Sequence, residues 1–276
     1  MADTPEIVSG SAAVEQDLAL IRDAAEEAGR IALTYFHGHE EMDVRMKGGN
    51  SPVSAGDLAA DTYLREILTK ARPDYGWLSE ESTDVSRTRR QTAPRSFIID
   101  PIDGTRAFID GRDIWCVSVG IVEGEVPVAG VLECPALGER FWASAGGGAF
   151  KDGRRLAVAK TPRAQPVVAA PPKAEPQLKR AFPGGYTRRG HIPSLAYRLA
   201  MVADGTLDAT LVKPRSHDWD IAAAVVILSE AGARLTAMDG TAVILNGDDI
   251  VKPAMMAGSP HMLEAMFGVV TAHAFG

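Results

Sequence analysis

The sequence predicts an α+β fold for the first part of the chain and an α/β fold for the second. Amphipathic helical patterns come first, strand-like segments separated by turn signals follow, and helices and strands alternate beyond residue 156. The chain has 276 residues, of which 46% are hydrophobic and 24% are charged. This is the composition of a globular protein with a large core, and the length suits about two domains.

Two helices are predicted before the first strand. Apolar residues recur every three or four positions from Val14 to Tyr35, so a long amphipathic helix is expected to end near Gly38. A second helix is expected to begin at Ser54, whose hydroxyl can cap the free amides of the first turn, and Asp57 lies in that turn.

Several segments rich in β-branched and aromatic residues follow, and turn signals such as Glu123-Gly124 separate them. Their spacing suits an antiparallel sheet with helices on one side. The predicted strands are residues 97–99, 115–122, 126–132 and 140–143.

Prolines crowd residues 161–177, which indicates a change of structural unit. We therefore predict a boundary near residue 156, with an N-terminal α+β domain at 1–156 and a C-terminal α/β domain at 157–276. The C-terminal domain is predicted to contain helices at 195–202 and 219–231 and strands at 209–212 and 241–245.

The formal net charge of −7 argues against nucleic-acid polymers as ligands, because the sequence has no basic stripe with interleaved aromatic residues. A small anionic substrate would be repelled unless a local positive charge, such as a bound cation, reversed the field. The opening residues lack a signal-peptide pattern and the longest apolar run, 221–228, is too short to span a bilayer, so we expect a cytoplasmic protein without membrane contact. Cys116 and Cys134 cannot form a disulfide framework and are expected to be small buried side chains.

The most informative segment is residues 97–106, where an apolar run ends in two carboxylates, a glycine and a hydroxyl. We predict that Pro101 stops the pairing of a strand and that Gly104 permits a tight turn. Asp100 and Asp103 would then lie together at the end of the strand. Two close carboxylates repel each other unless a cation or a proton lies between them, although a polar turn that caps the next helix would give the same pattern.

Other segments repeat this pattern, with a carboxylate at the boundary between an apolar element and a turn. Glu80 and Glu81 follow a short apolar run and would point to opposite sides in extended geometry, so at most one of them is a ligand. Asp218 and Asp220 precede an apolar helix, and Asp57 lies in a first helical turn. Each has a simpler explanation, as a charge at a helix N-terminus or a solvated turn residue.

Together these segments suggest a metal site with oxygen ligands, which suit Mg²⁺ or Mn²⁺. The candidate ligands are Glu80, Asp100, Asp103 and Asp220. Gly104 and Thr105 open a predicted helical turn, whose free amides would face the cluster and can bind phosphate. A carboxylate cluster with bound magnesium beside such a turn suits phosphomonoester hydrolysis.

The spacing of the aspartates also bears on the mechanism. Thr105 could orient an attacking water and Asp57 could take its proton. The common Asp-x-Asp phosphatase motif, in which an aspartate is the nucleophile, is not matched, because residues 100 and 103 are three positions apart. We therefore predict direct attack by water.

At these motifs the chain resembles the inositol monophosphatase superfamily, the lithium-sensitive, magnesium-dependent phosphatases, and the match covers most of the chain. Asp-Pro-Ile-Asp-Gly-Thr at residues 100–105 reproduces the family signature, and Glu-Glu-Ser at 80–82 fits its upstream glutamate motif. Trp-Asp-Ile-Ala-Ala at 219–223, followed by Glu-Ala-Gly at 230–232, fits its C-terminal signature. Lys47, Ser-Pro-Val at 51–53 and Asp57 match the loop and helix start ahead of them.

The resemblance implies a layered αβαβα sandwich with the site between the domains. It also implies that two or three Mg²⁺ ions are bound, that Asp57 and Thr105 activate water with Glu80, and that Asp218 takes no part. Glu81 and Lys47 would contact the metal ligands rather than the metal ions. Many relatives are dimers, and a homodimer is left open because no interface patch can be read from the sequence. The implied metal ligands are Glu80, Asp100, the backbone carbonyl of Ile102, Asp103 and Asp220.

Departures from the family pattern bear on the substrate. Inositol-specific members usually have a second threonine after Asp-Gly-Thr, and several residues before Trp-Asp they have a glutamate that accepts hydrogen bonds from sugar hydroxyls. Here Arg106 and Lys213, with Arg215, stand at the corresponding places, which favours a substrate with a second negative group. If Lys213 and Arg215 are instead solvated loop charges, they indicate nothing about the substrate.

The glutamate motif and the basic residue after Gly-Thr also resemble the 3'(2'),5'-bisphosphate nucleotidase branch. That branch acts on 3'-phosphoadenosine 5'-phosphate, which is the substrate we expect. Histidinol phosphatases of this family share Asp-Gly-Thr, a basic residue and Phe-Ile in this region, and inositol 1-phosphate is a further candidate. A non-catalytic regulatory or binding protein could keep the fold, yet all the expected ligands are present. A divalent-ion buffer is not supported, because no regular Ca²⁺ loop occurs.

Overall fold

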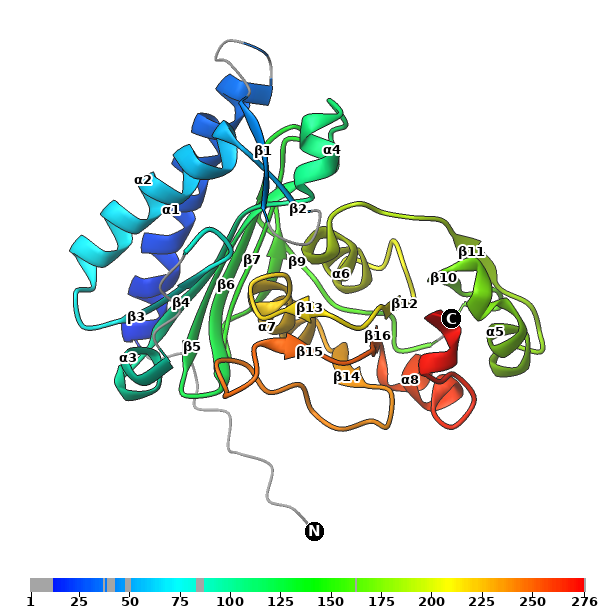
Figure 1. Ribbon diagram of the computed structural model, residues 1–276. Helices are drawn as coiled ribbons and strands as arrows, with labels where there is room; N and C mark the ends of the chain where they lie inside the picture. The colour runs from blue at the N-terminus through cyan, green and yellow to red at the C-terminus, as the bar shows by residue number, and fades with distance from the viewer. Residues whose placement is uncertain are drawn as a thin grey trace.

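The computed structural model describes residues 12–36, 38, 43–47, 51–82, 87–161 and 163–275. Helical layers and sheets alternate in it (Figure 1), so the expected αβαβα arrangement is confirmed. In order, the layers are α1 (Ala12–Phe36) with α2 (Ala55–Ala71), a seven-stranded sheet, α6 (Leu195–Ala203) with α7 (Ala222–Glu230), a five-stranded sheet, and α5 (Glu175–Ala181) with α8 (Pro260–Met266).

The two predicted N-terminal helices are confirmed. α1 ends at Phe36, and α2 begins after Ser54, whose backbone amide donates to Asp57 Oδ2 at 2.9 Å in a capping box. Ile21 and Leu64 are fully buried against one face of the seven-stranded sheet. The apolar stripe read from the sequence is therefore the face that packs.

The seven-stranded sheet is antiparallel except that its first strand runs parallel to the second, which the sequence did not indicate. Helices cover both faces, so the prediction of helices on one side is wrong, because α7 arrives from the distant part of the chain to cover the second face. The strand order is β3 (Gly76–Ser79), β4 (Ser96–Asp103), β5 (Cys116–Glu123), β6 (Val126–Cys134), β7 (Glu139–Ser144), β8 (Gly148–Lys151) and β9 (Arg154–Arg155).

α7 lies very close to this sheet because β5 and β6 present glycines to it. A Cβ atom on Gly130 would lie 2.6 Å from the carbonyl oxygen of Ala223, and one on Gly120 would lie 3.0 Å from the Cβ atom of Ala222. A larger residue would push the helix away. The close approach brings the turn that precedes α7, and with it Asp220, to the sheet.

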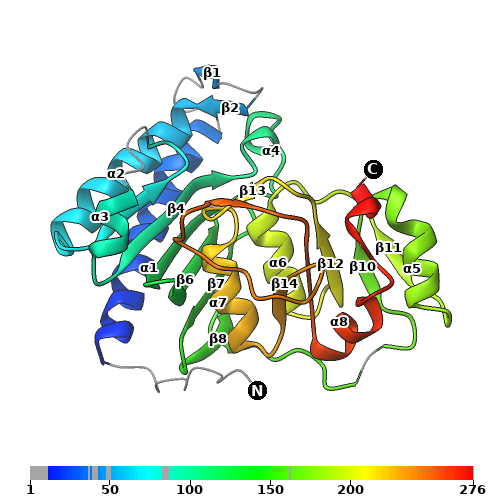
Figure 2. The same ribbon diagram turned by 60° about the horizontal axis from the view of Figure 1, so that its bottom comes forward.

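The five-stranded sheet lies beyond α6 and α7 (Figure 2). Its central strands bury both faces: Val168 faces α5 and α8, whereas Ala169 faces α6 and α7. The strand order is β11 (Thr187–Arg189), β10 (Val167–Ala169), β12 (Ala209–Val212), β16 (Met255–Gly258) and β14 (Arg234–Ala237), with β10 parallel to both of its neighbours.

The remaining elements are short. Two small antiparallel sheets pair β1 (Val44–Lys47) with β2 (Ser51–Ser54), and β13 (Ser216–His217) with β15 (Val251–Lys252). The short helices are α3 (Arg87–Thr92), α4 (Thr105–Ile109), and the 3-10 turns η1 (Pro172–Ala174) and η2 (Ala272–Phe275). Within the described residues, no helix combines the length and apolar character needed to cross a bilayer.

The C-terminal predictions are confirmed in part. The strand at 209–212 and the helix at 195–202 are present, and α7 starts at Ala222 because residues 217–220 form a turn. The strand predicted at 241–245 is wrong: only Ala242 makes a bridge, to Thr236, and Ile244 is 55% exposed. Its β-branched residues lie in a loop that buries little more than Leu245.

The first sheet ends at Arg155 and the second begins at Val167, yet one apolar core joins them through α6 and α7. The division into domains at residue 156 therefore stays a prediction. Cys116 and Cys134 are both buried and free, as expected.

Candidate active site

The site begins at a bulge in β4. The prediction that Pro101 ends the pairing is wrong, because Asp100 pairs with Ser118 and pairing resumes between Asp103 and Cys116. β4 thus has one more residue than β5 in this interval. Residues three apart in a regular strand point to opposite faces, and the extra residue of a bulge changes this, so that both carboxylates reach one site. Proline is tolerated there because a bulged residue makes no ladder hydrogen bond.

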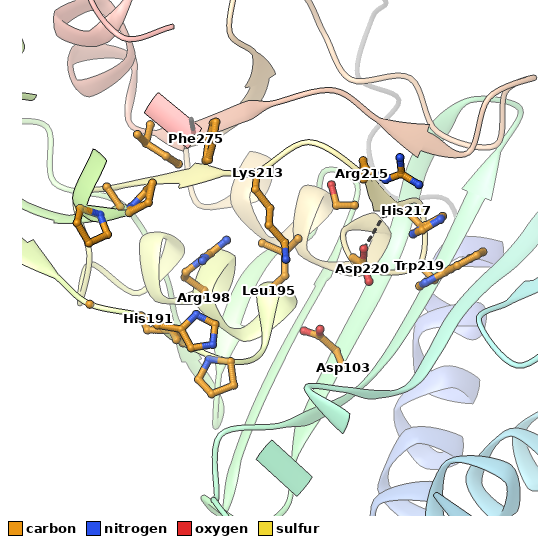
Figure 3. Close-up of a pocket in the computed structure, with 18 of the residues that line it drawn as sticks. Asp103, His191, Leu195, Arg198, Lys213, Arg215, His217, Trp219, Asp220 and Phe275 are labelled. Carbon is orange, nitrogen blue, oxygen red and sulfur yellow. Dashed lines mark hydrogen bonds between the residues drawn. The ribbon is translucent and has the colours of Figure 1, made fainter. Parts of the chain in front are cut away.

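Asp220 joins them from the turn before α7. The His217 amide donates to Asp220 Oδ2 at 2.6 Å and fixes that turn (Figure 3). Carboxylate oxygens of Asp100, Asp103 and Asp220 lie within 4.8 Å of one another. The structure therefore brings three of the predicted ligands together from two distant segments.

α6 holds Asp103 from the other side. The hydroxyl of Ser194 donates to Asp103 Oδ2 at 2.5 Å, and the amide of Ala196 donates to the same oxygen at 2.6 Å. Ser194 is also the N-cap of α6, where it accepts from the Tyr197 amide at 3.0 Å. The sequence did not lead us to predict Ser194 as a residue of the site. A serine before a predicted helix indicates a cap, but nothing local shows that it reaches β4.

Asp57 and Thr105 form a second polar unit beside the ligands. The Thr105 hydroxyl lies 3.2 Å from Asp57 Oδ1 and 3.0 Å from the Ile102 carbonyl oxygen, so its one proton has two acceptors. The hydroxyl of Ser54 donates to the other oxygen, Asp57 Oδ2, at 2.6 Å. Asp57 is thus held on one side by the cap of α2 and linked on the other to β4 through Thr105.

Burial raises the pKa values of these carboxyl groups. It raises the pKa of Asp57 and that of Asp103 to about 6, that of Asp220 to about 8, and that of Asp100 well above its usual range. The charge of Glu80 raises all four pKa values further, so Glu80 lies near the cluster although it is outside the set of three close carboxylates. The groups cannot all be ionised together unless a cation lies among them.

Removing divalent cations should therefore make stability fall as the pH rises. Asp57, Asp103 and Asp220 bind protons more tightly in the folded protein than in the unfolded chain, where the pKa is about 3.8. Their contribution is fully present below that pKa and is lost as the pH passes about 6 and then about 8. For Asp57 alone the loss is about 3 kcal/mol.

Urea unfolding between pH 4 and pH 8, with a chelator and with excess Mg²⁺, measures this effect. Mg²⁺ should abolish the decline. Stability that stays constant or rises with pH in the chelator would contradict the electrostatic description of the cluster.

A cavity of about 910 Å³ opens beside the carboxylates. Glu80, Asp103 and Asp220 line part of it, and in Figure 3 His191 and Arg198 lie to one side of the two aspartates. Much of the remaining wall is basic. The basic residues of the lining are Arg188, His191, Arg198, Lys213, Arg215 and His217.

The other predicted site residues lie in different places. Lys213 lines the cavity, but the described lining does not include Arg106, whose side chain is exposed on α4. Gly104 has φ of 102°, and a Cβ atom there would lie 3.2 Å from a backbone oxygen, so this turn needs glycine. The Glu81 amide donates to the Ser79 hydroxyl at 3.3 Å. The side chain of Lys47 lies outside the described residues.

Asp218, expected to take no part, is fully buried and forms an ion pair with Lys252. The roles given to individual site residues stay predictions.

A sequence model of the inositol monophosphatase family matches residues 13–270. The chain belongs to this family of phosphatases. It is 32% identical to the 3'(2'),5'-bisphosphate nucleotidase CysQ of Aggregatibacter actinomycetemcomitans, over 76% of this chain and 80% of the relative. It is 33% identical to the histidinol-phosphatase of Mycobacterium tuberculosis (82% and 89%) and 34% identical to the inositol-1-monophosphatase of Mesorhizobium japonicum (83% and 88%).

Solved structures agree with this membership. The extragenic suppressor protein suhB of Bartonella henselae superposes with a TM-score of 0.76 at 29% identity, covering 92% of this chain and all of the neighbour. The inositol monophosphatase of Anabaena gives 0.74 at 26% identity, with 93% and 97% covered. Relatives named for different substrates are about equally similar to this chain. The comparisons therefore do not identify the substrate, which has to be argued from the chemistry of the cavity.

Proposed function

We propose that the protein is a Mg²⁺-dependent phosphomonoesterase that hydrolyses a small phosphorylated metabolite by direct attack of water, with 3'-phosphoadenosine 5'-phosphate preferred. The observation that carries this proposal is the set of three carboxylates within 4.8 Å, beside the Asp57–Thr105 unit and next to a cavity with basic walls. Members of the family generally use Mg²⁺, and the donor set fits it, since every donor is an oxygen.

The residues proposed to hold Mg²⁺ lie on three segments, with Glu80 contributing beside the three close carboxylates. When bound, Mg²⁺ supplies charge neutralisation at the phosphoryl oxygens and lowers the pKa of a water. The proposed ligands are Glu80, Asp100, the Ile102 carbonyl, Asp103 and Asp220.

Asp57 and Thr105 are proposed to act on the attacking water. The Thr105 hydroxyl can accept a hydrogen bond from the water while it donates to Asp57 Oδ1. Asp57, with a pKa of about 6, is largely ionised near neutral pH and can take up the proton. The capping box of α2 holds its carboxylate in place during this step.

The basic wall supports a substrate with a second anionic group rather than a neutral polyol. A hydroxyl-rich substrate such as inositol phosphate gains from hydrogen-bond acceptors in the wall, whereas cations favour a further phosphate. This favours a nucleotide bisphosphate over inositol 1-phosphate and histidinol phosphate.

The test is phosphate release from 3'-phosphoadenosine 5'-phosphate, inositol 1-phosphate, histidinol phosphate and fructose 1,6-bisphosphate, side by side at saturating Mg²⁺, with and without Li⁺. The nucleotide should have the highest kcat/KM, and Li⁺ should inhibit. A large preference for inositol phosphate or histidinol phosphate would overturn the nucleotide assignment. Absence of turnover with all four substrates would favour a binding protein.

A further inference from the structure

Glu80 occupies the second position of a tight turn that follows β3. The Ser82 amide donates to the Ser79 carbonyl oxygen at 3.2 Å and closes this turn. The Glu80 amide donates to the Ile99 carbonyl oxygen at 3.1 Å, which fastens the turn to β4 at the residue before Asp100. Glu80 and the carboxylates of β4 therefore share one backbone support.

Side chains fasten the same turn at both ends. The Ser79 hydroxyl donates to Asp61 Oδ1 and accepts from the Glu81 amide at 3.3 Å. At the other end, Trp77 Nε1 donates to the Ser82 hydroxyl at 2.9 Å. Ser79 is only 1% exposed, so water has little access to replace the carboxylate that its hydroxyl contacts. The contact between Ser79 and Asp61 thus ties the start of the turn to another element.

That element is α2, on which Asp61 follows Asp57 by one helical turn. Residues four positions apart are neighbours on one face of a helix. The carboxylate of Asp57 contacts Thr105 beyond the end of β4, and that of Asp61 contacts Ser79 at the end of β3. β3 and β4 are parallel neighbours, so their carboxyl ends lie at the same edge of the sheet. One face of α2 therefore supports both the Asp57–Thr105 unit and the turn that carries Glu80.

We propose that Asp61 is a positioning residue, which holds Glu80 in the geometry that binds metal by fixing the hydroxyl of Ser79. The inference rests on the proposed function, because it takes Glu80 as a metal ligand. Groups that hydrogen-bond around a metal site orient its ligands, and their loss typically weakens metal binding or activity about 10- to 100-fold. Asp61 acts through Ser79 and Glu80 and takes no part in the chemical step.

Mn²⁺ binding to the full chain without substrate, measured by calorimetry after removal of divalent cations, tests this role. Asp61→Ala removes the acceptor and should weaken Mn²⁺ binding about 10- to 100-fold. Asp61→Asn removes the same charge but keeps an acceptor oxygen, so it should recover most of the affinity. The control Glu66→Ala removes an exposed carboxylate of α2 and should leave Mn²⁺ binding unchanged.

Ser79→Ala breaks the same contact from the other side. It should weaken Mn²⁺ binding as much as Asp61→Ala does, and the double variant should bind no more weakly than either single variant, because both remove one hydrogen bond. In each single variant the Mg²⁺ concentration for half-maximal turnover should rise, while kcat at saturating Mg²⁺ changes much less. A purely structural role predicts the reverse, since a smaller folded fraction lowers kcat and leaves the affinity of the folded protein unchanged.

Glu80→Gln separates failure of this inference from failure of the proposed function. If Glu80→Gln weakens Mn²⁺ binding and Asp61→Ala does not, Glu80 is a ligand that needs no support from Asp61, and the positioning role is rejected. Equal losses in Asp61→Asn and Asp61→Ala also reject it, because the lost charge alone then accounts for them. If Mn²⁺ binding depends on Glu80, Asp61 and Ser79 as expected but none of the four phosphate esters is hydrolysed, the proposed phosphomonoesterase function fails and the positioning role stands.

Discussion

Replacing Asp100 by asparagine is expected to lower phosphatase turnover by about 1,000-fold or more. Asp100 is 1% exposed and lies within 4.8 Å of two other carboxylates, and its Oδ1 atom accepts from the Ile102 amide at 3.1 Å. Asparagine keeps the shape and this acceptor but removes the charge that would hold a divalent cation. A bound metal contributes several kcal/mol of charge stabilisation to phosphoryl transfer, which sets the size of the loss.

The same substitution should stabilise the protein when metal is absent. Burial and the charges of Glu80, Asp103 and Asp220 raise the pKa of Asp100 well above its usual range, so its ionised form is unfavourable in the folded state. Removing one negative charge from the cluster relieves that repulsion. A gain of about 1 kcal/mol would raise the Tm by about 2–4 °C in a chain of this size.

Turnover at saturating Mg²⁺ and thermal unfolding in a chelator, both at pH 8, measure the two effects. Asp110→Asn is the matched control, because Asp110 is exposed and pairs only at the surface with Arg112, at 2.7 Å. This control should leave turnover unchanged and should change the free energy of unfolding by no more than about 0.5 kcal/mol. If Asp100→Asn keeps its turnover, the carboxylate cluster is not the reaction centre. If the variant is less stable than wild type without metal, the carboxylates of the cluster do not repel one another in the way described.

The clustering of the carboxylates could be predicted from the sequence because these residues occur in short motifs. Carboxylates at the ends of apolar segments identified Asp100, Asp103 and Asp220, and the cap pattern placed Asp57 at the start of α2. These signals are local, since they depend on neighbours a few positions away. The layered fold followed from the resemblance that the same motifs carry.

Features that depend on pairing between distant segments could not be predicted. The bulge in β4 exists only relative to β5, so the sequence suggested that Pro101 ended the strand. The contact of Ser194 with Asp103 joins α6 to β4, two elements that lie far apart in the sequence. Residues 241–245 have the composition of a strand, but the structure gives them no continuous partner.

The contacts of Asp218 also join distant segments and could not be predicted from the sequence. They lead us to expect a large effect on stability when its partner is removed. The side chain of Asp218 is fully buried, its Oδ2 atom accepts from the Asn246 amide at 2.7 Å, and its Oδ1 atom lies 2.6 Å from Lys252 Nζ. Burial raises the pKa of Asp218, and Lys252 opposes this, so the lysine is what permits a buried charge two residues before Asp220.

Lys252→Met is therefore expected to lower the free energy of unfolding by about 3–5 kcal/mol, because it leaves that carboxylate buried without its partner. Lys179→Met is the matched control, since Lys179 forms an exposed i, i+4 pair with Glu175 at 2.8 Å, which solvent screens, so this variant should leave stability nearly unchanged. Urea unfolding measures both variants.

The pair should also affect the site through the turn of residues 217–220. Asp218 fastens this turn to the segment 246–252, and the same turn aims Asp220 at the other two carboxylates. Lys252→Met should thus raise the Mg²⁺ concentration needed for half-maximal activity more than it lowers turnover at saturating Mg²⁺. Adding Asp218→Asn removes the stranded charge and should recover part of the lost stability. If the double variant is no more stable than Lys252→Met, the loss came from packing of the lysine stem, and the buried charge is not what Lys252 serves.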